Sequence, residues 1–145
     1  MVLLATGFGV GNVPFAPGTF GSLLAIPIFL GLPFLSTLGG ATVGALVLAV
    51  AMAVWIAAEA DAAMGEHDSG RIVVDEVLGM LVALAGLPRT AWGIAVAFVL
   101  FRVFDVVKVW PASAIDRRVA GGAGVVLDDV VSGIYANVAA RLVLW

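Results

Sequence analysis

The feature that most constrains this chain is an apolar stretch without any charged side chain, over residues 37–58. At a rise of 1.5 Å per residue, its roughly 22 residues form a helix long enough to cross about 30 Å of hydrocarbon. The whole chain is similarly apolar, with a mean hydropathy of +1.18 and charge on only 12% of its residues. A soluble domain needs roughly a quarter of its residues charged to cover its surface. We therefore expect an integral membrane protein.

The other apolar runs predict further membrane spans. They are continuous and lack the period-two alternation of membrane β-strands, so we expect helices. Two of the runs are long enough to cross only if their helices continue through the charged residues Asp75 and Glu76 and through Arg102. The predicted fold class is all-α, a multi-helix membrane bundle forming a single domain over residues 1–145. We expect five spans, namely residues 19–35 with Thr19 as N-cap, 37–58, 72–87, 91–107 and 130–145.

Three polar segments precede the first span or overlap the ends of later ones: residues 1–18, 59–76 and 102–129. Two predicted spans separate each segment from the next, and two spans return the chain to the side of the membrane from which it started. All three segments are therefore expected to converge on one face. The third segment holds most of the basic residues, and the positive-inside bias places that face in the cytoplasm. These residues are Arg102, Lys108, Arg117 and Arg118.

Carboxylates gather within these polar segments. Burying them among apolar groups costs free energy, so a cluster of acids at the ends of membrane helices predicts a functional site. Carboxylate oxygens with a single imidazole are hard ligands that suit Mg²⁺ or Mn²⁺ better than zinc or copper. The candidate metal ligands are Asp68, Asp75, Glu76, Asp128 and Asp129, and His67 lies beside them in the sequence.

Basic and small polar residues supply candidate anion sites. Asp105 lies three residues from both Arg102 and Lys108, which places an acid between two bases along one helical stripe. Gly18, Thr19 and Ser22 come at the start of a predicted helix, where backbone N–H groups and two hydroxyls can bind an anion.

Composition excludes several classes of protein. Cysteine is absent, so thiolate metal sites and cysteine phosphatases are excluded, and a lipid phosphatase that uses two histidines is excluded because there is one histidine. Seven scattered Lys and Arg residues are too few for a nucleic-acid interface. The glycines of residues 7–11 lack both the Rossmann spacing and a GK[ST] motif, which makes nucleotide binding improbable.

Four sequence blocks together resemble the phosphatidylglycerophosphatase A family. They are GFGVGNVPFAPGTFGS (residues 7–22), HDSGRIVVDEVLG (67–79), FRVFDVVK (101–108) and GGAGVVLDDVVSG (121–133). The resemblance implies a multi-pass enzyme of the bacterial inner membrane that depends on Mg²⁺ and acts on a phospholipid within the bilayer. Its reaction would remove the terminal phosphate of phosphatidylglycerophosphate to give phosphatidylglycerol. The sequence departs from the family's Lys-Pro-x-Pro at Val109.

This chemistry gives each candidate a role. The five acids would hold one or two Mg²⁺ ions, because a phosphate dianion would otherwise be repelled by so many carboxylates. Arg102 and Lys108 would stabilise charge on the phosphoryl oxygens. His67 would protonate the leaving oxygen or activate water, and a covalent intermediate on Asp105 remains an alternative to direct attack by water.

Two other classes of protein fit the composition. A small cation transporter or channel would use intramembrane carboxylates as an ion path, but it is expected to show inverted repeats and acids near the centres of its spans. Here the acids gather at the predicted helix ends. A scaffold subunit of a membrane complex would need no clustered ligands.

Overall fold

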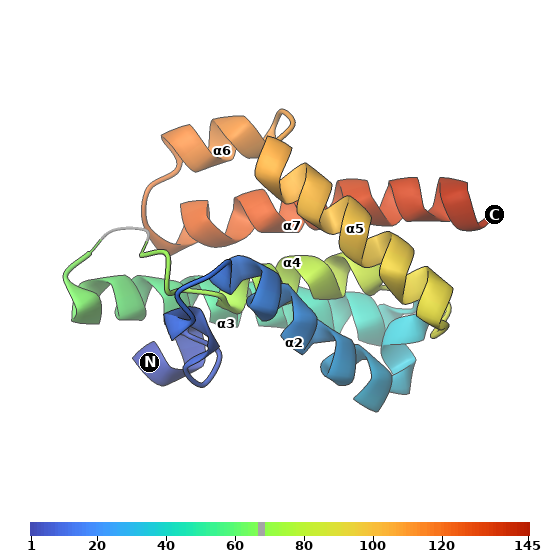
Figure 1. The fold of residues 1–145 in the computed structure, drawn as a ribbon, viewed down its shortest axis with the longest axis horizontal. Helices are drawn as coiled ribbons and strands as arrows, with labels where there is room; N and C mark the ends of the chain where they lie inside the picture. The colour runs from blue at the N-terminus through green and yellow to red at the C-terminus, as the bar shows by residue number, and fades with distance from the viewer. Residues whose placement is uncertain (67–68) are drawn as a thin grey trace.

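The computed structural model describes residues 1–66 and 69–145, and the described chain is helical without strands (Figure 1). The predicted all-α class is confirmed for these residues. Five helices are longer than two turns, and short helices precede, connect or follow them. In order the elements are α1 (Val2–Ala5), η1 (Val10–Asn12), α2 (Pro17–Gly31), η2 (Pro33–Ser36), α3 (Gly40–Met64), α4 (Val74–Leu84), α5 (Ala91–Val107), α6 (Ala112–Arg118) and α7 (Gly121–Leu144).

Helices α3 and α5 are present where the sequence predicted spans. Helix α3 begins at Gly40 rather than at residue 37 and continues past residue 58 to Met64, and its C-cap Gly65 has the left-handed conformation typical of that position. Helix α5 begins after Thr90, whose hydroxyl accepts a hydrogen bond from the Gly93 N–H at 3.1 Å. It continues through Arg102 to Val107, as the prediction required.

Helices α2, α4 and α7 differ from the prediction at their amino ends. Thr19 is not an N-cap, because Pro17 takes the first position of α2, where its missing N–H costs nothing. Helix α4 begins at Val74 rather than at residue 72, and its 11 residues extend roughly 17 Å, too short to cross a bilayer. Helix α7 begins at Gly121 rather than at residue 130, so Asp128 and Asp129 lie within a helix and not ahead of one.

Helix α7 is the centre of the packing and contacts α3, α4, α5 and α6 (Figure 1). On one side, α2, α4, α5 and α7 enclose a buried cluster that includes Phe29, Met80 and Phe101. On the other side, α1, α3, α4 and α7 enclose a second cluster around Ile56 and Val126. Alanines make up much of both clusters, and such small side chains let helices approach closely.

Helices α4 and α7 cross where both lack a side chain. A methyl group at Gly79 would lie 2.7 Å from the Phe101 ring and 2.8 Å from the Asp129 carbonyl oxygen. A side chain at Gly133 would overlap the Gly79 carbonyl oxygen. This close crossing brings Asp129 next to the first turn of α4.

The carboxyl end of α4 is capped by side chains of α7. The Asn137 amide donates hydrogen bonds to the carbonyl oxygens of Ala83 at 2.8 Å and Ala85 at 2.7 Å, and more distantly to that of Val82 at 3.3 Å. Arg141 donates to the Ala85 carbonyl at 3.1 Å and to the Asn137 side-chain oxygen at 2.9 Å. Carbonyls that a helix end leaves without partners are thereby satisfied.

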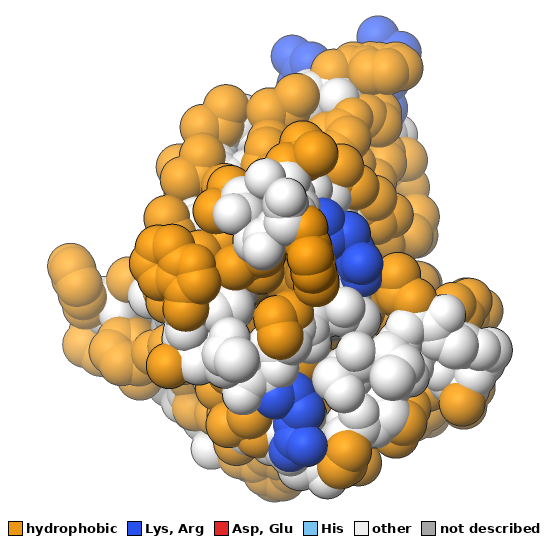
Figure 2. All heavy atoms as spheres, turned by 90° about the vertical axis from the view of Figure 1, so that its right-hand side faces the viewer, with side chains coloured by type: hydrophobic (Ala, Val, Ile, Leu, Met, Phe, Trp, Pro, Cys, Tyr) orange, Lys and Arg blue, Asp and Glu red, His pale blue; other side chains and the backbone are white. Residues whose placement is uncertain are grey.

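Much of the surface is apolar. Val47, Leu48 and Trp55 on α3 are among many large hydrophobic side chains that are more than half exposed. Helices α3 and α7 are long and apolar enough to cross a membrane by length and composition. Figure 2 shows the end of the molecule that lies to the right in Figure 1, where hydrophobic side chains dominate, some basic ones appear and no Asp or Glu is visible.

Candidate functional site

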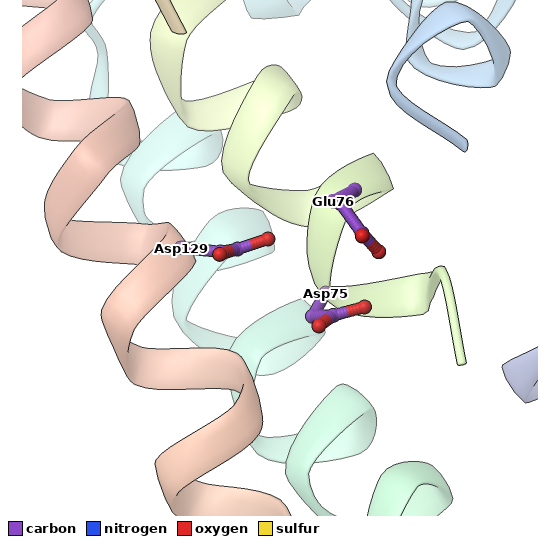
Figure 3. A group of neighbouring side chains, drawn as sticks. All are labelled: Asp75, Glu76 and Asp129. Carbon is purple, nitrogen blue, oxygen red and sulfur yellow. The ribbon is translucent and has the colours of Figure 1, made fainter. Parts of the chain in front are cut away.

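Three carboxylates from two helices meet beside the first turn of α4. Asp75 and Glu76 occupy adjacent positions of that turn, and Asp129 reaches toward them from α7 (Figure 3). One oxygen from each residue lies within 4.8 Å of the other two. Asp75 is 8% exposed and Asp129 4% exposed, and Glu76 is half-buried.

Each of these carboxylates has a buried oxygen without a hydrogen-bond partner among the described residues. These atoms are Asp75 Oδ1, Glu76 Oε2 and Asp129 Oδ2. Buried charge left unpaired costs several kcal/mol, on the order of 3–5 kcal/mol for one broken ion pair, so a cation bound among these three groups would be strongly stabilising. Mg²⁺ prefers carboxylate oxygens, and here three carboxylates place an oxygen each within 4.8 Å of the others. The donor set and its spacing therefore fit Mg²⁺.

The amino end of α2 and the guanidinium of Arg102 border this cluster. A side chain at Gly18 would overlap the Glu76 carboxylate and lie 3.5 Å from Arg102 Nη1. Glycine at this position thus allows the positive end of the α2 dipole to approach the acids. Arg102 also forms an ion pair with Asp105, with 2.5 Å between Nη1 and Oδ2. Asp105 in turn lies near Asp129.

Thr19 and Ser22, the two predicted anion-binding hydroxyls, occupy the first turns of the same helix. The Ser22 hydroxyl is buried and donates a hydrogen bond to the Gly18 carbonyl at 2.8 Å, so its proton is committed to the helix backbone. Thr19 is half-buried beside Gly18. The backbone at Gly18 is therefore the part of the predicted anion seat that borders the carboxylates.

Lys108 links two further acids next to the cluster. Its Nζ lies 2.8 Å from Asp116 Oδ1 and 2.6 Å from Asp128 Oδ2. Burial lowers the pKa of the Lys108 ammonium, but its hydrogen bonds and attraction to Asp116 and Asp128 outweigh burial and raise that pKa overall. Asp128 Oδ1 accepts a hydrogen bond from the Asp129 N–H at 2.9 Å, so both Asp128 oxygens are engaged. Asp128 thus lies beside the three carboxylates but is paired with Lys108.

The structure brings together residues from all three predicted polar segments. Gly18, Arg102 and Asp105 surround the carboxylates of Asp75, Glu76 and Asp129. His67 and Asp68 lie outside the described residues. Asp116 was missed among the site candidates, although its eight-residue distance from Lys108 across a proline turn was visible in the sequence.

Comparisons with known proteins agree on one family. The family model described as Phosphatidylglycerophosphatase A matches residues 3–144. The chain is 42% identical to phosphatidylglycerophosphatase A of Escherichia coli (strain K12) over 135 residues, which cover 92% of this chain and 77% of that protein. The Haemophilus influenzae protein of the same name is 40% identical over 136 residues, which cover 92% of this chain and 82% of that protein.

One relative carries a different name. A protein of Bacteroides thetaiotaomicron, provisionally named a phosphatidylinositol-3-phosphatase, is 39% identical over 99% of this chain and 93% of its own length. No solved structure matches the chain.

Proposed function

This chain belongs to the phosphatidylglycerophosphatase A family, and we propose that it hydrolyses the terminal phosphomonoester of phosphatidylglycerophosphate, giving phosphatidylglycerol and phosphate. The observation that carries the proposal is the group of three carboxylates with unpartnered buried oxygens, beside an arginine and a helix amino end. Acids alone would repel a phosphate. Acids that hold a cation, flanked by positive groups, attract one.

Asp75, Glu76 and Asp129 are the proposed Mg²⁺ ligands. Each offers a carboxylate oxygen that has no other partner in the described chain. When bound, the ion neutralises these acids, polarises the phosphoryl group and lowers the pKa of a coordinated water. Asp128, and Asp68 outside the described residues, are further acids close to these ligands in the sequence.

Arg102 is the proposed contact to the transferred phosphoryl group. Its guanidinium has five N–H donors, and Asp105 orients it through the ion pair at 2.5 Å while leaving other donors available. This pairing favours a positioning role for Asp105 over a role as nucleophile. The α2 amino end at Gly18 contributes positive potential from the other side, and Lys108 holds Asp128 in place. His67 is the proposed acid for the leaving oxygen.

The proposal includes a multi-pass location in the bacterial cytoplasmic membrane. Exposed apolar side chains on α3 and the length of α3 and α7 support insertion in a bilayer. The acids border Arg102 and Lys108, whereas Arg141 caps the opposite end of α4. The positive-inside bias therefore orients the acid end toward the cytoplasm, where a lipid head group enters from the inner leaflet.

The test is phosphate release from phosphatidylglycerophosphate by the purified protein in detergent, with Mg²⁺ and with a chelator. We expect release with Mg²⁺, loss to background with chelator, and recovery when Mg²⁺ is restored. Glu76→Gln should abolish release, whereas Glu59→Gln, an exposed acid on α3, should leave it unchanged. Absence of release by the wild-type protein would refute the proposed reaction, and full activity in chelator would refute the metal.

The relative with the different name sets a second arm of the same assay. Phosphatidylinositol 3-phosphate carries the same phosphomonoester on another head group, so the ratio of kcat/KM for the two lipids measures head-group preference. We expect the ratio to favour phosphatidylglycerophosphate. A ratio that favours the inositol lipid would reassign the substrate while retaining the chemistry.

A further inference from the structure

Two valines next to the catalytic acids separate two apolar grooves. Val74 and Val77 are three residues apart on α4, so they share a helix face. They flank Asp75 and Glu76 in the sequence. Both valines line a groove toward α2 and a second groove toward α3. We call this pair the valine ridge.

The first groove lies between α2, the valine ridge and the amino-terminal segment. Its volume is about 330 Å³, and its lining includes Leu4, Phe8, Leu24 and Ile28. Phe8 and Ile28 are exposed, so the groove is open to the surroundings. Leu24 follows Gly18, which borders Glu76, by six residues of α2, roughly 9 Å along the axis. The groove therefore runs away from the carboxylates along α2.

The second groove lies between α3 and the other side of the valine ridge. Its volume is about 190 Å³, and its lining includes Ala49, Met52 and Ile56. Met52 is half exposed, so this groove is open as well. Leu78 and Leu81 extend its α4 wall toward the carboxyl end of the helix, away from Asp75.

We infer that the two grooves hold the two acyl chains of the lipid substrate, one on each side of the valine ridge. The inference rests on the proposed function, because a phosphate at the carboxylates fixes where the head group lies. Both grooves are lined by Val74 and Val77, which bracket Asp75 and Glu76 in the first turn of α4, and the other lining residues are apolar as well. Another apolar hollow, lined by Trp92, Ala95 and Val99, begins at the amino end of α5 and is not continuous with the carboxylates.

Lipid hydrocarbon already covers the bilayer-embedded surface of a membrane protein. The grooves must therefore contribute more to acyl-chain binding than the exclusion of water. Binding in a groove gains packing contacts that are absent among mobile lipid tails. A side chain that fills a groove should therefore weaken long-chain substrates selectively. Substrates whose chains are too short to occupy the groove should be spared.

The test compares groove-filling variants with matched controls. Ile28→Trp fills the first groove and Ala49→Phe fills the second, whereas Val99→Trp and Ala95→Phe place the same side chains in the remote hollow. Phosphate release is measured with dioleoyl and dihexanoyl phosphatidylglycerophosphate. We expect the ratio of kcat/KM, long chain to short chain, to fall about tenfold in each groove variant. Both control variants should keep the wild-type ratio.

An unchanged ratio in the groove variants, or an equal fall in the controls, overturns the inference. A wild-type protein that releases phosphate from neither lipid refutes the proposed function instead, so the two failures are distinguishable.

Because a bulky variant can misfold, a second measurement uses the wild-type protein with dihexanoyl substrate and a phospholipid that carries a photoreactive acyl chain. We expect crosslinks to residues 24–28 and 49–56 that excess dioleoyl substrate competes away, and uniform labelling that includes residues 92–99 overturns the inference.

Discussion

The two ends of α4 face the same partner helix, but polar atoms have hydrogen-bond partners at one end and lack them at the other. At the carboxyl end, Asn137 and Arg141 of α7 donate hydrogen bonds to the carbonyls that the helix leaves free. At the amino end, Asp129 of α7 adds another carboxylate to Asp75 and Glu76, and oxygens of all three lack partners in the described chain. Satisfied polar groups stabilise a fold, whereas clustered groups that lack partners are suited to bind something else.

The largest expected effect follows from removing a charge at the amino end. Asp129→Asn keeps the shape of the side chain but weakens the proposed cation site, so phosphate release should fall on the order of 10²–10³-fold. The metal-free variant should be at least as stable as the wild type, because a buried carboxylate charge with an unpartnered oxygen is lost.

Thermal unfolding with and without Mg²⁺ separates the two readouts. Mg²⁺ should raise the Tm of the wild-type protein and not that of Asp129→Asn, since a ligand stabilises only the state that binds it. A variant that keeps most of its activity, or that responds normally to Mg²⁺, would contradict the assignment of Asp129.

A moderate effect, on stability rather than on activity, is expected at the carboxyl end of α4. Asn137→Leu leaves the carbonyls of Ala83 and Ala85 short of a donor, so the free energy of unfolding should fall by about 1–3 kcal/mol. The turnover of the protein that remains folded should stay within about threefold of wild type.

Chemical denaturation in detergent measures this loss. Asn12→Leu changes an exposed asparagine and serves as the control for stability. If Asn137→Leu lost turnover while remaining stable, the contrast between the two ends of α4 would not hold.

The smallest effect is expected at Asp116, which shares Lys108 with Asp128. Asp116→Asn removes the exposed member of the pair, and exposed ion pairs contribute roughly 0.2–1 kcal/mol, so kcat should fall less than about fivefold.

The raised pKa of Lys108 stabilises the fold below the ordinary lysine pKa of about 10.4, and this stability is lost only as pH rises through the higher folded value. Activity between about pH 6 and 9 should therefore show no step from Lys108. A large loss in Asp116→Asn, or such a step, would place the Lys108 network inside the chemistry.

The sequence predicted the arrangement of polar segments better than the bounds of helices. The predicted convergence of the three polar segments agrees with the contacts among Gly18, Glu76 and Arg102, although α4 is too short to be one of the full spans on which that prediction was based. The start of α7 could not be read from the sequence, since the glycines at 121, 122 and 124 suggest a break in a soluble helix. Here Gly122 fits against the backbone of Val54 and Ala58 on α3, a contact that exists only after the helices pack.

Two site details also depended on tertiary contacts. The hydroxyl of Ser22 is a group that can bind an anion. Its position four residues after Gly18 lets it donate a hydrogen bond to the carbonyl oxygen of its own helix instead. The polar side chain of Asn137 lies within an apolar helix, where an amide is costly unless it finds hydrogen-bond partners. Its partners lie more than fifty residues earlier in the chain, so only the fold identifies them.

The crossing of α4 and α7 at Gly79 and Gly133 makes the spacing of the three carboxylates depend on two positions that carry no ligand atom. A methyl group at either position would overlap neighbouring atoms and push the helices apart, so we expect alanine there to weaken the proposed cation site. Substitutions of the large exposed hydrophobic residues should therefore disturb the carboxylates less than substitutions of these two glycines.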